Sequence, residues 1–133
     1  MAVLMTPLQA WEAARSTTVS GIRVSFSVVP VAALDLDHAQ RTRPADPEAL
    51  HRISVQLTER KTGRHVSEAE ADVIITSGDY ASGPIRLERA SGGGRIYFET
   101  TISHVPRAAL YQVDFRLAGS PTVTSAQFDY RHQ

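Results

Sequence analysis

The chain contains no cysteine among its 133 residues. This absence excludes disulfides, thiolate metal sites, iron–sulfur clusters and cysteine nucleophiles. Lysine is scarce too, because Lys61 is the only one and arginine supplies the rest of the positive charge. The 14 basic residues balance the 14 acidic ones, so the formal net charge is +0. Without a basic excess, neither nucleic acid nor an anionic membrane surface is an expected partner.

Long apolar runs are also missing from the sequence. None approaches the ~20 residues needed to span a bilayer, so we expect no membrane insertion of the domain itself. The opening Met1–Met5 is too short for a signal-peptide core and has no basic residues before it. Two locations therefore stay open. The chain is either extracytoplasmic, after removal of an export signal, or cytoplasmic.

The chain divides into a short leader and one domain. In residues 1–20, Leu8, Trp11 and Ala14 do not sustain a helical pattern, and we interpret this segment as a tail or leader remnant. Residues 21–133 have a length that suits one domain of ordinary composition, with 42% hydrophobic and 21% charged residues over the whole chain.

A period of two governs the sequence from Gly21 onward. Apolar residues alternate with polar ones in short segments separated by glycine, proline and polar turns, which is typical of half-buried strands. The clearest apolar rows are Ile22/Val24/Phe26/Val28, Ile53/Val55/Leu57, Ala69/Ala71/Val73/Ile75, Ile85/Leu87, Ile96/Phe98/Thr100/Ile102, Tyr111/Val113/Phe115/Leu117 and Ala126/Phe128/Tyr130. A phase slip between Val123 and Ala126 predicts a bulge in the last strand. The pattern predicts an all-β fold, an antiparallel immunoglobulin-like β-sandwich of about seven or eight strands.

Residues 109–115 resemble the penultimate strand of immunoglobulin-like domains, in which a tyrosine hydroxyl bonds back to the main chain. Tyr111 is the matching position. The wider order of segments is similar to the YtkA-like and FixH-like group of bacterial extracytoplasmic domains, on residues 53–58, 62–63, 69–75, 94–102 and 111–117. This resemblance implies an immunoglobulin-like fold and a place in the cell envelope, in some members beside copper or cytochrome-oxidase machinery.

Histidine and aspartate offer the one candidate metal site. Asp35 and Asp37 would share a face of an extended segment that ends at His38, and His51 follows across a long polar loop. Imidazole and carboxylate are ligands for Cu(II) or Zn(II). We therefore predict a copper or zinc site at Asp35, Asp37, His38 and His51, with a solvated loop as the alternative.

Two other patterns point away from catalysis. Ser91-Gly92-Gly93-Gly94 precedes a strand rather than a helix and has no lysine for phosphate, so it is interpreted as a hairpin connection. No G-x-S-x-G elbow occurs, and we predict that the chain is not an enzyme.

Tyr97 lies opposite the inward row of its strand and is the best candidate for an exposed aromatic residue; cross-strand pairing is the alternative.

Two functions from different classes remain. The first is a non-catalytic interaction module of the bacterial cell envelope, which holds another protein by a sheet face, an edge strand or loops. The alternative is a metal- or small-ligand-binding envelope protein of the copper-handling type. Converging histidines or acidic loops would favour the second function.

Overall fold

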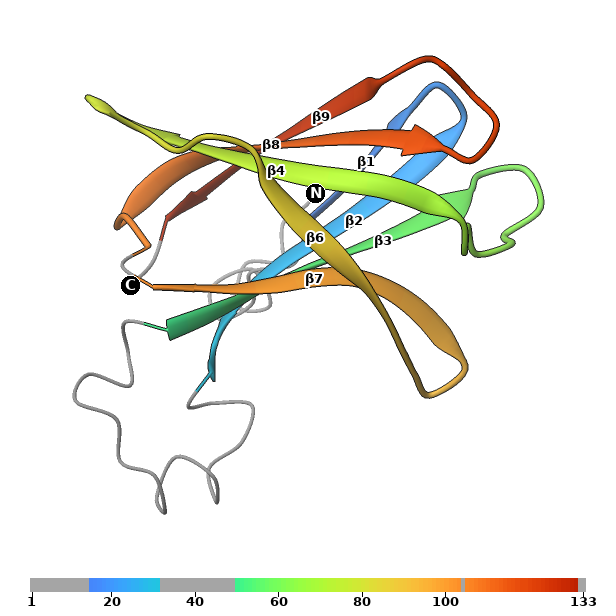
Figure 1. Ribbon diagram of the computed structural model, residues 1–133, viewed down its shortest axis with the longest axis horizontal. Helices are drawn as coiled ribbons and strands as arrows, with labels where there is room; N and C mark the ends of the chain where they lie inside the picture. Colours follow the sequence, from blue (N-terminus) through green and yellow to red (C-terminus); the bar gives the residue numbers. More distant parts are fainter. Residues whose placement is uncertain (1–14, 32–49, 104, 132–133) are drawn as a thin grey trace, which may run out of the picture.

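The computed structural model describes residues 15–31, 50–103 and 105–131, which form an antiparallel β structure (Figure 1). The strands are β1 (Arg15–Val19), β2 (Ile22–Pro30), β3 (Leu50–Glu59), β4 (Ala69–Ser77), β5 (Tyr80–Ala81), β6 (Ile85–Gly92), β7 (Arg95–Ser103), β8 (Ala108–Leu117) and β9 (Thr124–Arg131). The predicted all-β class is confirmed.

The pairing of these strands has the immunoglobulin order. One sheet runs β1-β2-β3-β7-β6, and the other contains β4, β8 and β9 with the short β5 beside β4. Taking β2 as strand A, the two sheets correspond to A-B-E-D and C-F-G of constant-type immunoglobulin domains. β1 is an additional strand on the free edge of β2.

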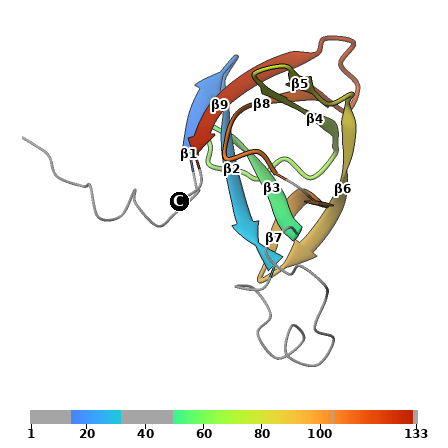
Figure 2. The same cartoon turned by 90° about the vertical axis from the view of Figure 1, so that its left-hand side faces the viewer.

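β6 joins the two sheets. Its first half pairs with β4 through Leu87 and Ala71, and its second half pairs with β7 through Ala90 and Tyr97. On the opposite side, β1 and β9 approach each other without pairing as a ladder, so the strands form a nearly closed ring when viewed end-on (Figure 2).

The alternation of apolar residues determines which side chains enter the core. The buried rows are those that the period of two predicts, and they include Val24, Phe26, Ile53, Val55, Leu57, Val73, Ile75, Phe98, Val113, Phe115 and Phe128. At the centre, the ring of Phe26 stacks on that of Phe128 with centroids 4.8 Å apart, and Tyr111 lies 5.1 Å from Phe26 on another side. Because both sheets contribute to this cluster, it holds them face to face.

Two-residue turns connect β1 with β2, β4 with β5 and β6 with β7. Gly93 and Gly94 both have positive φ, 60° and 77°, between the paired residues Gly92 and Arg95. Positive φ at both central positions is the type I′ geometry that matches the twist of paired strands. The glycine segment is thus a hairpin connection, as predicted from the sequence.

The structure corrects two details of the prediction. The sheet begins at Arg15, inside the segment interpreted as a tail, because Ser20 and Gly21 also form a positive-φ turn that pairs β1 with β2. The bulge predicted near Val123 is wrong. The β8–β9 register is continuous from Phe115 opposite Thr124 onward, and Val123 lies before the strand, 58% exposed.

Candidate functional site

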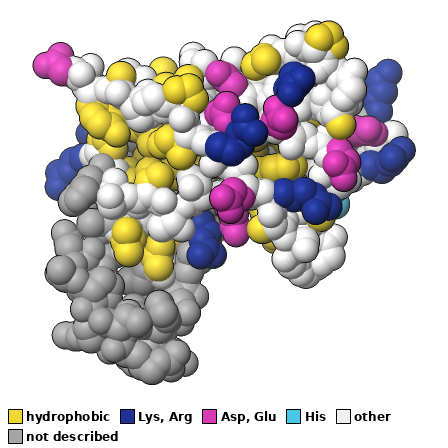
Figure 3. All heavy atoms as spheres, viewed as in Figure 1, with side chains coloured by type: hydrophobic (Ala, Val, Ile, Leu, Met, Phe, Trp, Pro, Cys, Tyr) yellow, Lys and Arg dark blue, Asp and Glu magenta, His cyan; other side chains and the backbone are white. Residues whose placement is uncertain are grey.

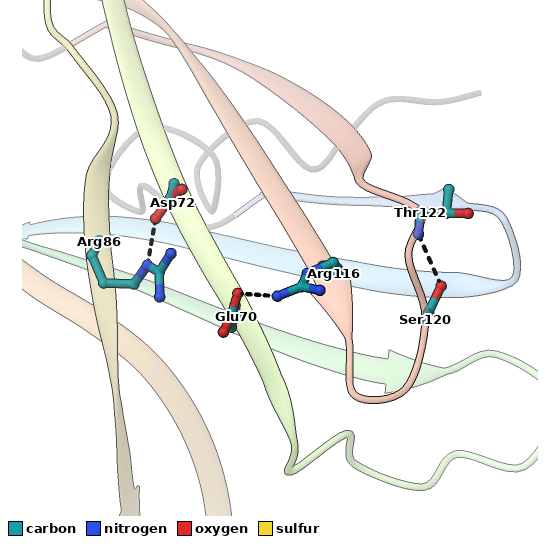
Figure 4. A network of polar contacts seen from close by, with 6 residues as sticks. All are labelled: Glu70, Asp72, Arg86, Arg116, Ser120 and Thr122. Carbon is teal, nitrogen blue, oxygen red and sulfur yellow. Dashed lines mark hydrogen bonds and ion pairs between the residues drawn. The ribbon is translucent and has the colours of Figure 1, made fainter.

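The outer face of the β4–β8–β9 sheet carries charged side chains that pair with one another. Arg116 donates from Nη2 to Oε1 of Glu70, and Arg86 donates from Nε to Oδ1 of Asp72, both at 2.6 Å (Figure 4). The hydrogen bond and positive charge of Arg116 lower the pKa of Glu70, and the hydrogen bond and negative charge of Asp72 raise the pKa of Arg86. Acidic and basic side chains accordingly lie interspersed where β4 and β6 run (Figure 3).

Several further polar groups of this face bind each other. Oδ1 of Asp114 accepts hydrogen bonds from Ser125 Oγ at 2.6 Å and from Gln112 Nε2 at 2.9 Å. Gln112 in turn accepts from Gln127 Nε2 at 3.4 Å. Because Arg86, Arg116 and several polar side chains already bind within this face, we assign it a structural, solvated role.

The β4–β8–β9 sheet has a depression of about 380 Å³ along Glu70, Arg116 and Gly119. The outer face of the β2–β3–β7 sheet is hollowed as well. A depression of about 320 Å³ is lined by Ser27, Val29, Arg52, Ser54, Tyr97 and Glu99. The register places Ser27 opposite Ser54, and Ser54 opposite Glu99, in one row across the three strands. Since two serines occupy the middle of this row, the larger side chains around them form walls over a low floor. We call this depression the outer hollow.

A second depression of about 260 Å³ continues the outer hollow toward β6. Its lining includes Arg52 and Glu99 again, together with Glu88, Arg89, Ala90, Thr100 and Thr101. The shared residues join the two depressions into one concave surface that reaches from β2 to β6. Tyr97 is opposite Ala90, so a small side chain lies beside the half-buried ring.

The charges of this concave surface are equal in number but are not paired. Within the described ranges, Arg52, Glu88, Arg89 and Glu99 form no ion pair, and Arg89 donates instead to the main-chain oxygen of Ser67 at 2.8 Å. Glu88 and Glu99 are directly opposite each other on adjacent strands. Like charges in that position destabilise a sheet, so this pair costs the fold some stability in the absence of a ligand.

Of the four residues of the predicted metal site, the structure describes only His51. Asp35, Asp37 and His38 lie outside the described residues, whereas His51 is on β3 with its side chain facing inward and 8% exposed. Its register neighbours are Pro30 and Ile102. In the described part of the chain, no three histidine, aspartate or glutamate side chains come together as a metal site. The copper or zinc site stays a prediction.

Tyr111 occupies the predicted place near the start of β8, but its hydroxyl behaves differently from that of an immunoglobulin tyrosine corner. The residue is 0% exposed, and its Oη has no hydrogen-bond partner in the described structure. Burial raises the pKa of Tyr111. The expected bond to the main chain is therefore not formed, because β8 directs the ring into the core between Phe26 and Tyr130.

The tyrosines other than Tyr111 lie in different environments. Tyr97 is half-buried and lines the outer hollow, whereas Tyr80 on β5 is 50% exposed and isolated from it. Tyr130 packs against the core, and Trp11 lies outside the described residues. Sequence periodicity predicted the outward direction of Tyr97. It could not reveal the hollow, because the two serines of the floor come from different strands.

Comparison with known proteins supports the fold of this chain but assigns it to no family. The sequence matches no protein-family model and no curated protein. Among solved structures, it is similar to a DUF4426 family protein from Pseudomonas aeruginosa PAO1, with a TM-score of 0.68, 17% identity and coverage of 90% of this chain and 94% of that one. It is also similar to FetP of uropathogenic E. coli strain F11, with a TM-score of 0.59, 9% identity and coverage of 92% and 97%. At these identities the likeness shows the fold alone, and the YtkA-like and FixH-like resemblance is not confirmed.

The described residues contain no helix of sufficient length and hydrophobicity to cross a membrane.

Proposed function

We propose that this chain is a non-catalytic interaction module of the bacterial cell envelope, which binds another protein on the outer face of its β2–β3–β7 sheet. The observation that carries the proposal is the concave surface with its unpaired charges, Arg52, Glu88, Arg89 and Glu99. On the opposite face, Glu70 and Asp72 are paired with arginines. This difference in pairing favours the outer hollow as the surface that a partner completes.

The shape of the surface supports a protein partner rather than a small substrate. The hollow is a shallow depression on a sheet, whereas small-molecule sites enclose most of their ligand. Its half-buried tyrosine, flanked by an arginine and polar residues, has the composition of a protein–protein contact. The rigid strands present these side chains in a fixed geometry, which limits the entropy cost of binding.

The envelope location is supported by the structural comparison. Both similar structures come from bacteria, and that of FetP was obtained after recombinant expression in the periplasm. The absence of cysteine means that the fold depends on no disulfide. It therefore requires neither an oxidising nor a reducing compartment.

The test uses two variants with the same change of charge. Ser54→Arg fills the floor of the outer hollow, and Gln127→Arg adds the same side chain to the opposite face. The tagged proteins are returned to the source bacterium, and the proteins that co-purify with each are compared quantitatively. We expect a partner that is retained by the wild type and Gln127→Arg but lost from Ser54→Arg. If both variants retain it equally, the hollowed face is not the binding surface.

A further inference from the structure

Three connections meet at one end of the molecule, where β1 joins β2, β3 joins β4 and β8 joins β9 (Figure 1). We call this end, made of residues 20–21, 60–68 and 118–123, the basic end. We propose that the basic end docks on a bilayer surface that contains anionic phospholipids, with Arg60, Lys61 and Arg64 at the phosphate groups and Val123 among the head groups. This interaction goes beyond the proposed function, because the residues of the basic end are not among those that line the outer hollow.

Main-chain hydrogen bonds hold the three connections together as one surface. The amide of Arg60 donates to the oxygen of Gly21 at 3.0 Å, and the amide of Ala118 donates to the oxygen of Glu68 at 3.1 Å. Gly63, with a φ of 76°, closes a tight turn within the β3–β4 connection. The side chains are therefore presented by an ordered backbone, which limits the entropy lost on binding.

The equal numbers of acidic and basic residues in the whole chain are not repeated at the basic end. Six charged residues lie in its connections or at the adjoining ends of β2 and β3, namely Arg23, Glu59, Arg60, Lys61, Arg64 and Glu68. Four are basic and two are acidic, and Lys and Arg side chains gather on this side of the molecule, on the right of Figure 3. Arg116 and Glu70, just inside this end, form an ion pair and add no net charge. An anionic surface is thus the complementary partner.

The basic side chains of the β3–β4 connection have no partner in the part of the chain that the structure describes. Arg60, Lys61 and Arg64 are exposed, and none of them forms an ion pair or a side-chain hydrogen bond there. The carboxylate of Glu59, in contrast, accepts a hydrogen bond from the hydroxyl of Thr62 at 2.7 Å. Guanidinium and ammonium groups bind phosphate oxygens by charge-assisted hydrogen bonds. An anionic bilayer attracts each such group that lies within a Debye length of its surface.

An exposed hydrophobic side chain favours a bilayer over a soluble polyanion. Val123 and Tyr80 are the exposed large hydrophobic residues of the described ranges, at 58% and 50%. Val123 lies at the basic end, close in sequence to the exposed Pro121, whereas Tyr80 lies on β5 at the opposite end. Peripheral membrane binding combines attraction to anionic lipids with burial of apolar surface at the head-group boundary. A soluble anion would leave Val123 in water.

Vesicle sedimentation tests the proposed docking. The full chain is mixed with large vesicles of phosphatidylcholine in which about a third of the lipid is phosphatidylglycerol, and the bound fraction is measured after centrifugation. Vesicles of phosphatidylcholine alone are the matched control. We expect binding to the anionic vesicles that weakens as salt is added, and no binding to the neutral vesicles.

Single variants identify the end that binds. Lys61→Gln and Arg64→Gln should each weaken binding to anionic vesicles by about three- to fivefold, the contribution of one basic residue near such a surface. Arg131→Gln removes the same charge from the opposite end and should leave binding nearly unchanged. The strands between the two ends have 9 or 10 residues and so span roughly 30 Å, well beyond a Debye length. Val123→Ser should also weaken binding, whereas Tyr80→Ser should not.

Several results would overturn the inference. They are no sedimentation with anionic vesicles at low salt, equal binding to neutral vesicles, and equal losses in Lys61→Gln and Arg131→Gln. If soluble polyphosphate binds as tightly as the vesicles and Val123→Ser weakens neither interaction, the ligand is a soluble anion and the docking on a bilayer is contradicted. The proposed function is tested separately, because Ser54→Arg and Gln127→Arg lie outside the basic end.

Discussion

Replacing Tyr111 by phenylalanine should stabilise this protein. The ring of Tyr111 is fully buried against Phe26 and Tyr130, and phenylalanine retains that packing. What the substitution removes is a hydroxyl without a hydrogen-bond partner in the described structure. A buried unsatisfied polar group costs about 1–3 kcal/mol. We therefore expect Tyr111→Phe to raise the free energy of unfolding by about 1–2 kcal/mol.

Urea denaturation measures this change directly. For a chain of this size the midpoint of thermal unfolding should rise by roughly 3–8 °C, and the urea midpoint should rise at an unchanged m-value. Tyr80→Phe is the matched control, because the Tyr80 side chain is exposed and its hydroxyl is in water. Its stability should equal that of the wild type. If Tyr111→Phe instead lowers stability by about 1 kcal/mol, the hydroxyl has a partner, as in a tyrosine corner, and the reasoning is refuted.

The same burial predicts an alkaline pH dependence. The unfolded chain loses the tyrosine proton near pH ~10, whereas the folded protein retains it because burial raises the pKa of Tyr111. Above that pH the folded state binds more protons than the unfolded state, so the stability contributed by neutral Tyr111 falls as pH rises. Tyr111→Phe should lose less stability than the wild type between neutral and strongly alkaline pH, as measured by urea midpoints across that range. If the urea midpoints of Tyr111→Phe and of the wild type change equally with pH, the raised pKa of Tyr111 is contradicted.

Three further substitutions test the packing, the turn and the charges. Phe115→Ala should lower the unfolding free energy by about 3–5 kcal/mol in urea denaturation, whereas Gln127→Ala on the outer face should change it little. Gly94→Ala should lower the free energy of unfolding by about 1–2 kcal/mol, because φ is 77° at this position. Gly92 lies outside the left-handed region, so Gly92→Ala should lower it clearly less. Equal urea midpoints for the two variants would contradict the turn geometry. Glu88→Gln should raise stability by about 0.2–1 kcal/mol at low salt, an effect that should shrink as salt is added.

The sequence predicts the face of the strand on which a side chain lies better than it predicts which strands pair with each other. Alternation places Phe26, Val55 and Phe115 in the core because a strand exposes one side to each face, a property of the local chain alone. The turns at Gly63 and at Gly93-Gly94 are also local, and glycine there has positive φ as expected. β1 was missed although Ser20-Gly21 carried a turn signal, because the polar Ser16-Thr17-Thr18 obscured the alternation.

The outer hollow could not be predicted, since it depends on register. Ser54 lies between Ser27 and Glu99 only because β7 pairs with β3, and those strands are separated by β4, β5 and β6 along the chain. Pairing of Glu88 with Glu99 likewise requires the exact length of the glycine hairpin. For the hydroxyl of Tyr111, the sequence resemblance led to a wrong expectation. The position of Tyr111 in the sequence resembles that of an immunoglobulin tyrosine corner, but whether a main-chain oxygen lies within hydrogen-bond distance of the hydroxyl depends on the path of the chain before β8.

Protection of single cysteines tests the central claim most directly, because the native chain has none to interfere. The Ser54→Cys and Gln127→Cys variants place one thiol on each outer face. Their rates of labelling by a maleimide are compared with and without the envelope fraction of the source bacterium. We predict that the fraction slows labelling of Ser54→Cys and leaves Gln127→Cys unchanged. Equal rates for Ser54→Cys with and without the fraction, or protection of Gln127→Cys alone, would show that a partner does not cover the hollowed face.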